Sequence, residues 1–339
     1  MSLYCLLLFY KQEGTFMRVL VTGGAGFIGS HLCEYLTQKG DEVIVLDDLS
    51  TGKFENIEHI RGVKCIIDST LNQDIVRDLV KDVDTVFHLA ATVGVNLVIN
   101  HPIQTIVNNI RGTETVLEET CRYRRSLLIT STSEVYGKSL KEVFEEEDDQ
   151  IIGPPHRHRW CYAASKAIDE FLTLAYWKEK RHPVYIVRLF NIVGPRQTGQ
   201  YGMVLPNFIT QALKGEPLHV YGDGQQTRSF AYVGDVVPAL VQIMERPDLC
   251  GKIFNLGNDK SVRIIDLANK VIELTKSSST IQLIPYEEAY PEGYEDMRHR
   301  VPCLKKIRQA IGYTPHTPLE TIILKVTEYI QKKLNSREI

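Results

Sequence analysis

Short apolar runs alternate with amphipathic segments along most of the chain from Arg18 onward. The runs are rich in β-branched residues, as buried strands are. They lie at residues 18–23, 42–48, 64–68, 84–91, 126–132 and 183–191. Between them, apolar residues recur at helical spacing, as in the stripe of Ile28, Leu32, Tyr35 and Leu36 that stops at Gly40. This alternation predicts an α/β fold with a doubly wound parallel sheet.

A longer amphipathic segment begins with "RWCYAASKAIDEF" at residues 159–171 and predicts a helix of several turns. Ile168, Phe171, Leu172 and Ala175 follow the spacing of one helical face. We expect this apolar stripe to face the sheet, because a helix of a layered α/β protein buries its apolar side.

A glycine-rich turn, "TGGAGFIGS", links the first predicted strand to the first predicted helix. Its Gly23, Gly26 and Gly29 would let the backbone turn tightly and bring the helix N-terminus close to a pyrophosphate. Asp47 ends the next strand and is placed to bind the adenosine ribose, where its charge would repel a 2′-phosphate. Asp68 closes the third strand and would lie near the adenine. The pattern predicts a Rossmann-type domain that prefers NAD to NADP.

The second part of the chain has a different pattern. After residues 190–202, turn residues become denser and the regular alternation ends, so a smaller C-terminal α/β domain is expected. Residues 227–237 and 252–257 resemble returns to the first domain. The expected division is an N-terminal extension at 1–16, a Rossmann domain at 17–191 with about 229–257, and a substrate domain at 192–228 and 258–339.

Charge and cysteine content narrow the classes of function. The formal net charge is −3 with no long basic cluster, which argues against nucleic acid as a partner. "HRHR" at 156–159 follows two prolines, and we expect a solvated loop there. The seven cysteines show no C-x-x-C spacing, which argues against a disulfide scaffold and a metal site and favours the cytoplasm. The apolar stretch near the N-terminus is too short to span a membrane.

Tyr162 and Lys166 are four residues apart in the long predicted helix, so their side chains share one face. A tyrosine has an ordinary pKa of about 10, but a neighbouring ammonium and a nicotinamide cation both favour the phenolate. Tyr162 is therefore a candidate general base. Thr132, at the end of its strand, can offer a hydroxyl to the same substrate oxygen.

Together these motifs resemble those of the extended short-chain dehydrogenase/reductase family, whose members remodel nucleotide sugars with NAD. The resemblance runs from Met17 to about residue 330. It rests on the motifs "TGGAGFIGSH", "HLAA", "NNIRGT", "STSEVYG", "YAASK", "LFNIVGPR" and "VYGDGQQTRSFAYV". It implies an NAD-binding Rossmann domain, a C-terminal domain that binds a UDP-sugar, and a homodimer formed by helices at about 104–121 and 162–179.

The resemblance also implies roles for individual residues. Those expected to bind NAD are Gly23, Gly26, Phe27, Ile28, Gly29, Asp47, Asp68, Leu89, Asn108, Tyr162 and Lys166. Those expected to bind the substrate are Asn191 and Arg228 at the diphosphate, Tyr221 at the base, Arg196 and Arg300. The expected catalytic residues are Thr132, Glu134, Tyr162, Lys166 and Arg300. In this family the tyrosine takes the proton of the sugar 4-hydroxyl while C4 loses hydride.

The residues after Thr132 help to decide the fate of the 4-keto sugar. The chain has Ser133 and Glu134 where 4,6-dehydratases have Asp-Glu, and "MRHRVP" supplies Arg300. These features are most similar to UDP-glucuronate decarboxylases, which form UDP-xylose or its 4-keto precursor. "YAASK" in place of "YDEGK" keeps a 4-epimerase of UDP-glucuronate or UDP-glucose as an alternative. A non-catalytic NAD or sugar-nucleotide sensor is the alternative from another class, and the intact catalytic motifs argue against it.

Overall fold

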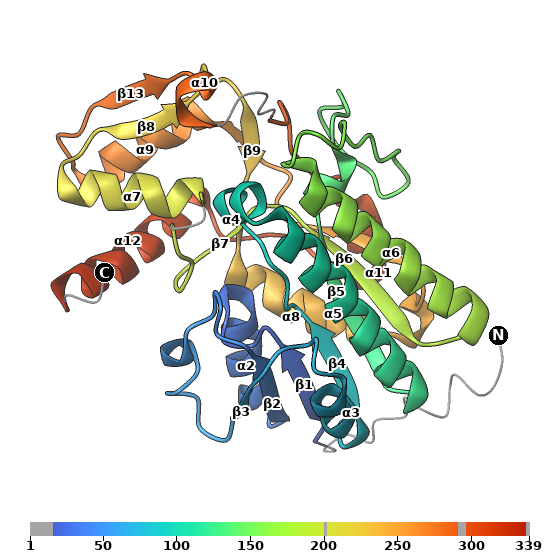
Figure 1. Ribbon diagram of the computed structural model, residues 1–339. Helices are drawn as coiled ribbons and strands as arrows, with labels where there is room; N and C mark the ends of the chain where they lie inside the picture. The colour runs from blue at the N-terminus through green and yellow to red at the C-terminus, as the bar shows by residue number, and fades with distance from the viewer. Residues whose placement is uncertain (1–15, 200–201, 291–295, 337–339) are drawn as a thin grey trace.

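The computed structural model describes residues 16–199, 202–290 and 296–336, and a seven-stranded parallel sheet lies at its centre (Figure 1). The strand order is β11-β6-β5-β4-β1-β2-β3. The strands are β1 (Arg18–Thr22), β2 (Glu42–Asp47), β3 (Lys64–Ile67), β4 (Thr85–His88), β5 (Ser126–Thr132), β6 (Val184–Leu189) and β11 (Ile253–Leu256). Each neighbouring pair is parallel, so the predicted fold class is confirmed.

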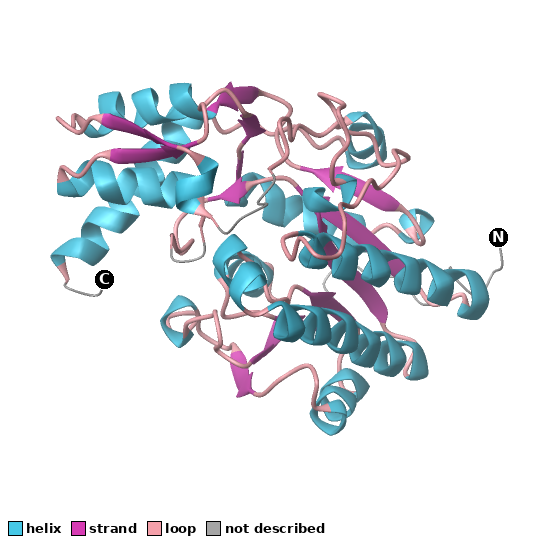
Figure 2. Cartoon of the chain, turned by 45° about the horizontal axis from the view of Figure 1, so that its top comes forward, coloured by secondary structure: helices cyan, strands magenta, loops and turns pink. Residues whose placement is uncertain are grey.

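Helices cover both faces of this sheet. On one face, α2 (Phe27–Gln38) packs against α8 (Val233–Met244). On the other, α3 (Gln73–Lys81), α5 (Pro102–Arg122) and α6 (Trp160–Lys180) lie side by side (Figures 1 and 2). Successive strand residues point to opposite faces, and accordingly Val19 and Val21 join the apolar cluster under α2 while Leu20 joins the one under α3 and α5.

A second, smaller lobe has its own apolar cluster and lies apart from the large sheet (Figure 1). Its parallel strands are β8 (Leu218–Tyr221) and β13 (Ile281–Ile284), and its helices are α7 (Val204–Lys214), α9 (Ile264–Thr275) and α12 (Leu319–Asn335). Two short pairs, β7 (Ile192–Val193) with β10 (Ala231–Tyr232) and β9 (Thr227–Ser229) with β12 (Ser261–Arg263), occupy the connection.

The remaining elements are short. They are α4 (Val95–Asn100), α10 (Tyr286–Ala289), α11 (Lys305–Ile311), η1 (Phe54–Asn56), η2 (Ser133–Tyr136) and η3 (Pro247–Leu249). Helix α11 packs on β11 and α8, so this late segment of the chain returns to the large sheet. Residues 252–257 include β11 of the large sheet, whereas 227–237 form β9, β10 and the start of α8. Strands β9 and β10 pair outside the large sheet, and only α8 packs on its strands β5 and β6.

The sheet has a switch point at its centre. Strand β1 lies between β4 and β2, so the strand order reverses direction there. In open α/β sheets, ligands bind in the crevice at the carboxyl ends of the strands beside such a point. The glycine turn after β1 lies at this position, and the small lobe lies over the same edge of the sheet (Figure 1).

The prediction that the apolar stripe of α6 faces the sheet is wrong in part. Ile168 and Phe171 are 46 % and 72 % exposed, so they point away from the sheet. The inward positions are taken instead by small and polar residues, among them Ala163, Ser165 and Asp169. The stripe failed as a prediction because α6 buries the polar groups of a functional site rather than a continuous apolar face.

The N-terminal extension expected at residues 1–16 lies outside the described residues except for Phe16. Within the described part of the chain, no helix is long and apolar enough to cross a membrane. The six cysteines there, Cys33, Cys65, Cys121, Cys161, Cys250 and Cys303, form no disulfide with one another.

Candidate active site

The backbone of the glycine turn after β1 lies so close to neighbouring backbone atoms that side chains would not fit at two of its glycines. Gly23 has φ of 71°, in the left-handed region, and a Cβ there would lie 2.7 Å from the backbone nitrogen of Ala90. A Cβ on Gly29 would lie 2.1 Å from the carbonyl oxygen of Gly23. Helix α2 therefore starts directly against the turn, and its N-cap, Gly26, provides no side-chain cap. The first-turn N–H groups of such a helix suit a phosphate.

Asp47 lies at the end of β2, beside this turn, and is 7 % exposed. The backbone N–H of Ala25 donates to its Oδ2 and that of Leu49 to its Oδ1, both at 2.9 Å. Burial raises the pKa of the Asp47 carboxyl, and these two bonds oppose the rise. Asp68 is held differently, because it accepts from the backbone of Ser69 at 2.7 Å and from Asn72 at 3.1 Å. Both carboxylates line the crevice that begins at the glycine turn.

A cavity of about 740 Å³ runs from the glycine turn to the small lobe. It is lined by Gly23, Gly26, Phe27, Ile28, Gly29, Asp47, Asp68, Leu89, Asn108, Thr132, Glu134, Tyr162, Asn191, Arg196, Tyr221, Arg228 and Arg300. These are the predicted site residues with the exception of Lys166. Residues far apart in the sequence thus share one cavity large enough for a cofactor and a substrate.

Tyr162 reaches the cavity from the first turn of α6 and is 8 % exposed. Burial raises the pKa of its phenol, and the negative charge of Glu134 raises it further. A hydrogen bond with Thr132 and the positive charge of Arg300 act in the opposite direction. The phenol is therefore protonated at neutral pH unless further positive charge comes close. Tyr162 can act as a base only when such a charge stabilises its phenolate.

Lys166 lies one turn after Tyr162 on α6 and is 2 % exposed. Its Nζ donates to Oδ2 of Asp169, one turn further along α6, at 2.8 Å. His88 at the end of β4 is buried nearby, and its ring nitrogens contact the hydroxyls of Thr22 at 2.7 Å and Thr113 at 3.2 Å. Burial, with a smaller effect of Lys166, lowers the pKa of His88 to about 3, so this imidazole is neutral near pH 7.

Glu134 and Arg300 form an ion pair whose two charges act on Tyr162. Nη1 of Arg300 donates to Oε1 of Glu134 at 3.1 Å, and Nη2 of Arg300 donates to Oδ1 of Asn191. Glu134 is the second residue of η2, two positions after Thr132, while Arg300 comes from the segment before α11. The predicted catalytic acid and arginine therefore meet, although 166 positions separate them in the chain.

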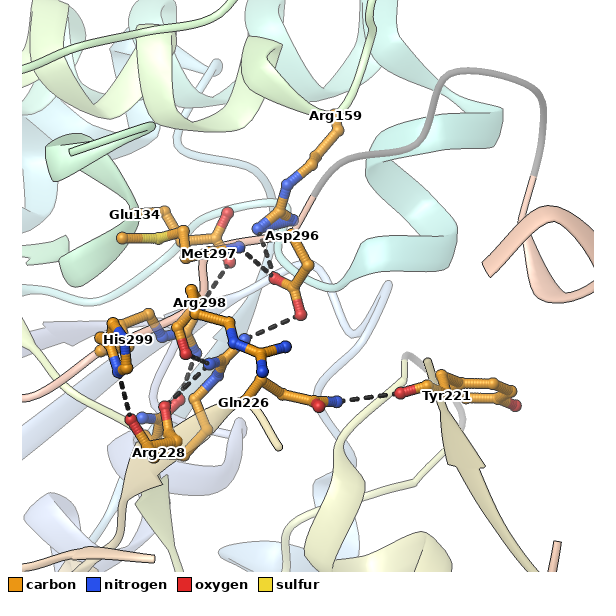
Figure 3. A network of polar contacts seen from close by, with 12 residues as sticks. Glu134, Arg159, Tyr221, Gln226, Arg228, Asp296, Met297, Arg298 and His299 are labelled. Carbon is orange, nitrogen blue, oxygen red and sulfur yellow. Dashed lines mark hydrogen bonds and ion pairs between the residues drawn. The ribbon is translucent and has the colours of Figure 1, made fainter. Parts of the chain in front are cut away.

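Asp296 joins two further arginines across the cavity (Figure 3). Its Oδ1 accepts from Arg159 at 3.0 Å and its Oδ2 from Arg228 at 2.7 Å. Burial acts to raise the pKa of Asp296, but Arg228, Arg159 and Arg300 outweigh it and lower the pKa. Together with Arg300 these groups form an arginine cluster suited to an anionic ligand.

The expectation that residues 156–159 form a solvated loop is wrong for Arg159, which is 6 % exposed. Arg159 precedes Tyr162 by three residues and lines the same cavity. That spacing was visible in the sequence, because residues three apart share a helical face. Asp296 was also missed, and its only signal was its position four residues before Arg300.

Tyrosines line the far end of the cavity, in the small lobe. Tyr221 and Tyr290 meet edge to face with ring centroids 5.4 Å apart, and Tyr286 lies 6.2 Å from Tyr290. Gln226 donates to the carbonyl oxygen of Tyr221 at 2.9 Å (Figure 3). Aromatic rings beside an amide suit a planar base, and Tyr286 and Tyr290 are additions to the predicted site.

Arg196 lies at the other side of the cavity. Its Nη2 donates to Oε2 of Glu34 in α2 at 2.7 Å and lies 3.2 Å from Nε2 of His59. The structure thus holds Arg196 against the helix that follows the glycine turn, and does not join it to the cluster of Arg159, Arg228 and Arg300.

The NAD dependent epimerase/dehydratase family model matches residues 19–257, which include the glycine turn, Tyr162 and Glu134. The chain belongs to this family. The expected cofactor, NAD, is the one that the family description names. This membership also confirms the resemblance inferred from the motifs.

Similar proteins of this family include two decarboxylases and an epimerase. The chain is 39 % identical to a UDP-N-acetyl-alpha-D-glucosaminuronate decarboxylase of Bacillus cytotoxicus, over 93 % of this chain and 98 % of that one. It is 38 % identical to UDP-glucuronic acid decarboxylase 1 of Danio rerio, over 96 % of this chain and 75 % of that one. The structure of UDP-glucuronic acid 4-epimerase from Bacillus cereus with UDP-glucuronic acid and NAD superimposes with a TM-score of 0.83, at 29 % identity, over 93 % of this chain and 99 % of that one.

Proposed function

We propose that this family member is an NAD-dependent decarboxylase that converts UDP-glucuronate, through a 4-keto intermediate, to a UDP-pentose. The ion pair of Glu134 and Arg300 beside Tyr162 carries this proposal, because it places an acid–base group and a carboxylate-binding group next to the redox base. The decarboxylases among the similar proteins support it.

The first step needs a base at the sugar 4-hydroxyl. Tyr162 takes this proton, and the hydroxyl of Thr132 binds the same oxygen. Bound NAD would supply the hydride acceptor for C4. Lys166 follows Tyr162 by one helical turn, and its positive charge favours the phenolate form that accepts the proton.

The second step uses the ketone that the first step creates. A carboxylate at C5 is then β to the C4 carbonyl, so loss of carbon dioxide leaves an electron pair that the carbonyl oxygen accepts. Arg300 orients the departing carboxylate, and Glu134 assists the proton movement at C5. The product is 4-keto UDP-pentose, or UDP-xylose if hydride returns to C4.

The arginine cluster and the tyrosines fit the rest of a UDP-sugar. We infer that Arg228 and Asn191 contact the diphosphate, that Tyr221 packs near the base, and that Arg159 adds positive charge on the Rossmann side. In this proposal, residues 17–191 with about 229–257 hold NAD, while 192–228 and 258–339 hold the sugar nucleotide.

A 4-epimerase of UDP-glucuronate is the second candidate, and the superposition with the Bacillus cereus enzyme favours it. Such an enzyme must keep the carboxylate close to the plane of the ketone so that decarboxylation is slow. It must then turn the sugar to receive hydride on its other face. The ion pair at C5 argues for the decarboxylase, because an epimerase needs no proton transfer at that carbon.

Product analysis tests the proposal. Purified protein is incubated with NAD and UDP-glucuronate, and separately with UDP-N-acetylglucosaminuronate and UDP-glucose, and products are identified by mass and NMR. We expect carbon dioxide and a UDP-pentose from UDP-glucuronate. UDP-galacturonate would instead establish the epimerase, and turnover of the N-acetylated acid alone would reassign the substrate. Binding without any turnover would support the sensor.

We also propose a homodimer in the cytoplasm. Helices α5 and α6 lie side by side on the outside of the sheet (Figure 2). They expose Ile103 and Ile106 on α5 and Ile168 and Phe171 on α6, with 80 % and 72 % exposure for Ile103 and Phe171. Contact between two such faces would bury these apolar side chains.

A further inference from the structure

Lys166 is held by a buried carboxylate on its own helix. Its Nζ lies 2.8 Å from Oδ2 of Asp169, and the two side chains are 3 % and 0 % exposed. We propose that Asp169 is a positioning residue that acts through Lys166: by pairing with the ammonium it weakens the positive field at the Tyr162 phenol and so sets the pH range in which this base works. The inference rests on the redox role proposed for Tyr162.

Asp169 is the negative charge that pairs with Lys166, because the other groups around this pair are neutral or paired elsewhere. Helix α5 packs against α6 here and presents the neutral groups Thr113 and Asn109. His88 of β4 is neutral because of its lowered pKa. Glu170, the next carboxylate on α6, is engaged by Arg188 at 2.9 and 2.8 Å.

The charged groups around Tyr162 divide into two pairs. Glu134 and Arg300 face it from η2 and the segment before α11, and they largely offset one another at 3.1 Å. Lys166 and Asp169 lie behind it on α6 and form the second pair. A phenol between two neutralised pairs feels little net positive charge, so its pKa stays raised by burial.

The sign of the effect follows from Coulomb's law. Asp169 lies two helical turns after Tyr162, about 10 Å along the axis, where one unit charge shifts a pKa by roughly one unit at an effective dielectric constant of about 20. Removing this negative charge leaves the ammonium unopposed. The phenolate then becomes more favourable, and the base works at lower pH.

The variant Asp169→Asn tests this most directly, because the amide oxygen can still accept a hydrogen bond from the ammonium while the charge is lost. The protein is labelled with carbon-13 at the phenol carbon of tyrosine, and its NAD complex is titrated by NMR without any sugar nucleotide. Tyr162→Phe identifies the signal. We expect the Tyr162 midpoint to fall by about one pH unit relative to wild type.

Asp266→Asn serves as the matched control, since Asp266 is a carboxylate of the small lobe paired with Arg263 on the surface. It should leave the midpoint unchanged. Asp169→Glu keeps the charge and should stay close to wild type. A midpoint that is unchanged or higher in Asp169→Asn would overturn the proposal.

Asp169→Ser removes the charge with a smaller side chain and covers the case in which Asp169→Asn does not fold. If neither neutral variant folds, Asp169 serves fold stability and the positioning role is refuted. The titration needs no substrate, so the two proposals can fail separately. If the Tyr162 midpoint shifts clearly but the protein does not decarboxylate UDP-glucuronate, only the proposed function is contradicted. The acid limb of the turnover profile with the true substrate should then move with the NMR midpoint.

Discussion

Arg300 donates to Glu134 at 3.1 Å across the cavity, although the two residues are 166 positions apart in the chain. Arg300 also donates to Asn191 at the end of the large sheet. The side chains of Arg300 and Glu134 are partly buried, with 17 % and 18 % exposure. A ligand can therefore reach them while bulk water is mostly excluded. The pair lines the same cavity as Tyr162, the proposed base, and the proposed choice of reaction rests on it.

Glu134→Gln keeps the size and hydrogen bonding of the side chain but cannot exchange a proton. We expect pentose formation from UDP-glucuronate to fall at least a hundredfold, a typical loss for an acid–base group. Binding of UDP-glucuronate, measured by calorimetry, should persist. The exposed Glu147 provides a control, and Glu147→Gln should remain fully active. Full activity of Glu134→Gln would leave Glu134 as a binding group.

Tyr162→Phe removes the titrating hydroxyl and keeps the ring in its buried position. Turnover should fall by about 10²- to 10⁴-fold, while NAD binding and the melting temperature stay near wild type. Burial raises the pKa of Tyr162, so the wild-type rate should increase with pH as the phenolate forms. If the variant unfolds instead, Tyr162 serves packing rather than catalysis.

Asp47→Asn should lower the preference for NAD over NADP, because it removes the charge that repels a 2′-phosphate. The change keeps the size of the side chain and one acceptor for the bonds from Ala25 and Leu49. Dissociation constants for both cofactors, measured by fluorescence, provide the test. Asp68→Asn should affect both cofactors alike, because Asp68 is expected near the adenine. A wild-type preference for NADP would show that Asp47 is misassigned.

Arg159→Ala leaves Asp296 with one arginine partner fewer and removes positive charge from the cavity. Truncating one member of a buried ion pair costs about 2 kcal/mol or more, so the KM for the sugar nucleotide should rise at least tenfold. NAD binding should not change. His158→Ala alters an exposed neighbour in the same segment and should behave as wild type. An unchanged KM would place Arg159 outside the substrate site.

Phe171→Asp places a charge on the exposed apolar surface of α5 and α6. If this surface pairs two copies, the mass in solution measured by light scattering should fall from that of a dimer to that of a monomer. Leu140 is 93 % exposed on a different segment, so Leu140→Asp should leave the dimer intact. A wild-type protein that is monomeric at micromolar concentration would contradict the proposed dimer.

The pattern of apolar residues and glycines along the chain was sufficient to predict the architecture of the large sheet. Strands with buried runs, helices with one apolar side and the turn around Gly23 and Gly29 are each encoded within a few neighbouring residues, so they were predictable without contacts. The shared face of Tyr162 and Lys166 was predictable in the same way, because residues four apart in a helix lie on the same face.

The sequence by itself therefore determined the fold class and the cofactor, and it brought Tyr162 and Lys166 onto one face of α6. Tertiary structure alone decided which distant residues meet: Glu134 with Arg300, and Arg159 with Arg228 through Asp296. It also decided that Phe171 points outward and that Asp169 points inward to Lys166. The physical reason is that hydrophobic periodicity specifies which side of an element is buried only when that side is apolar. Where a helix buries charged groups, their place depends on partners that other elements bring to them.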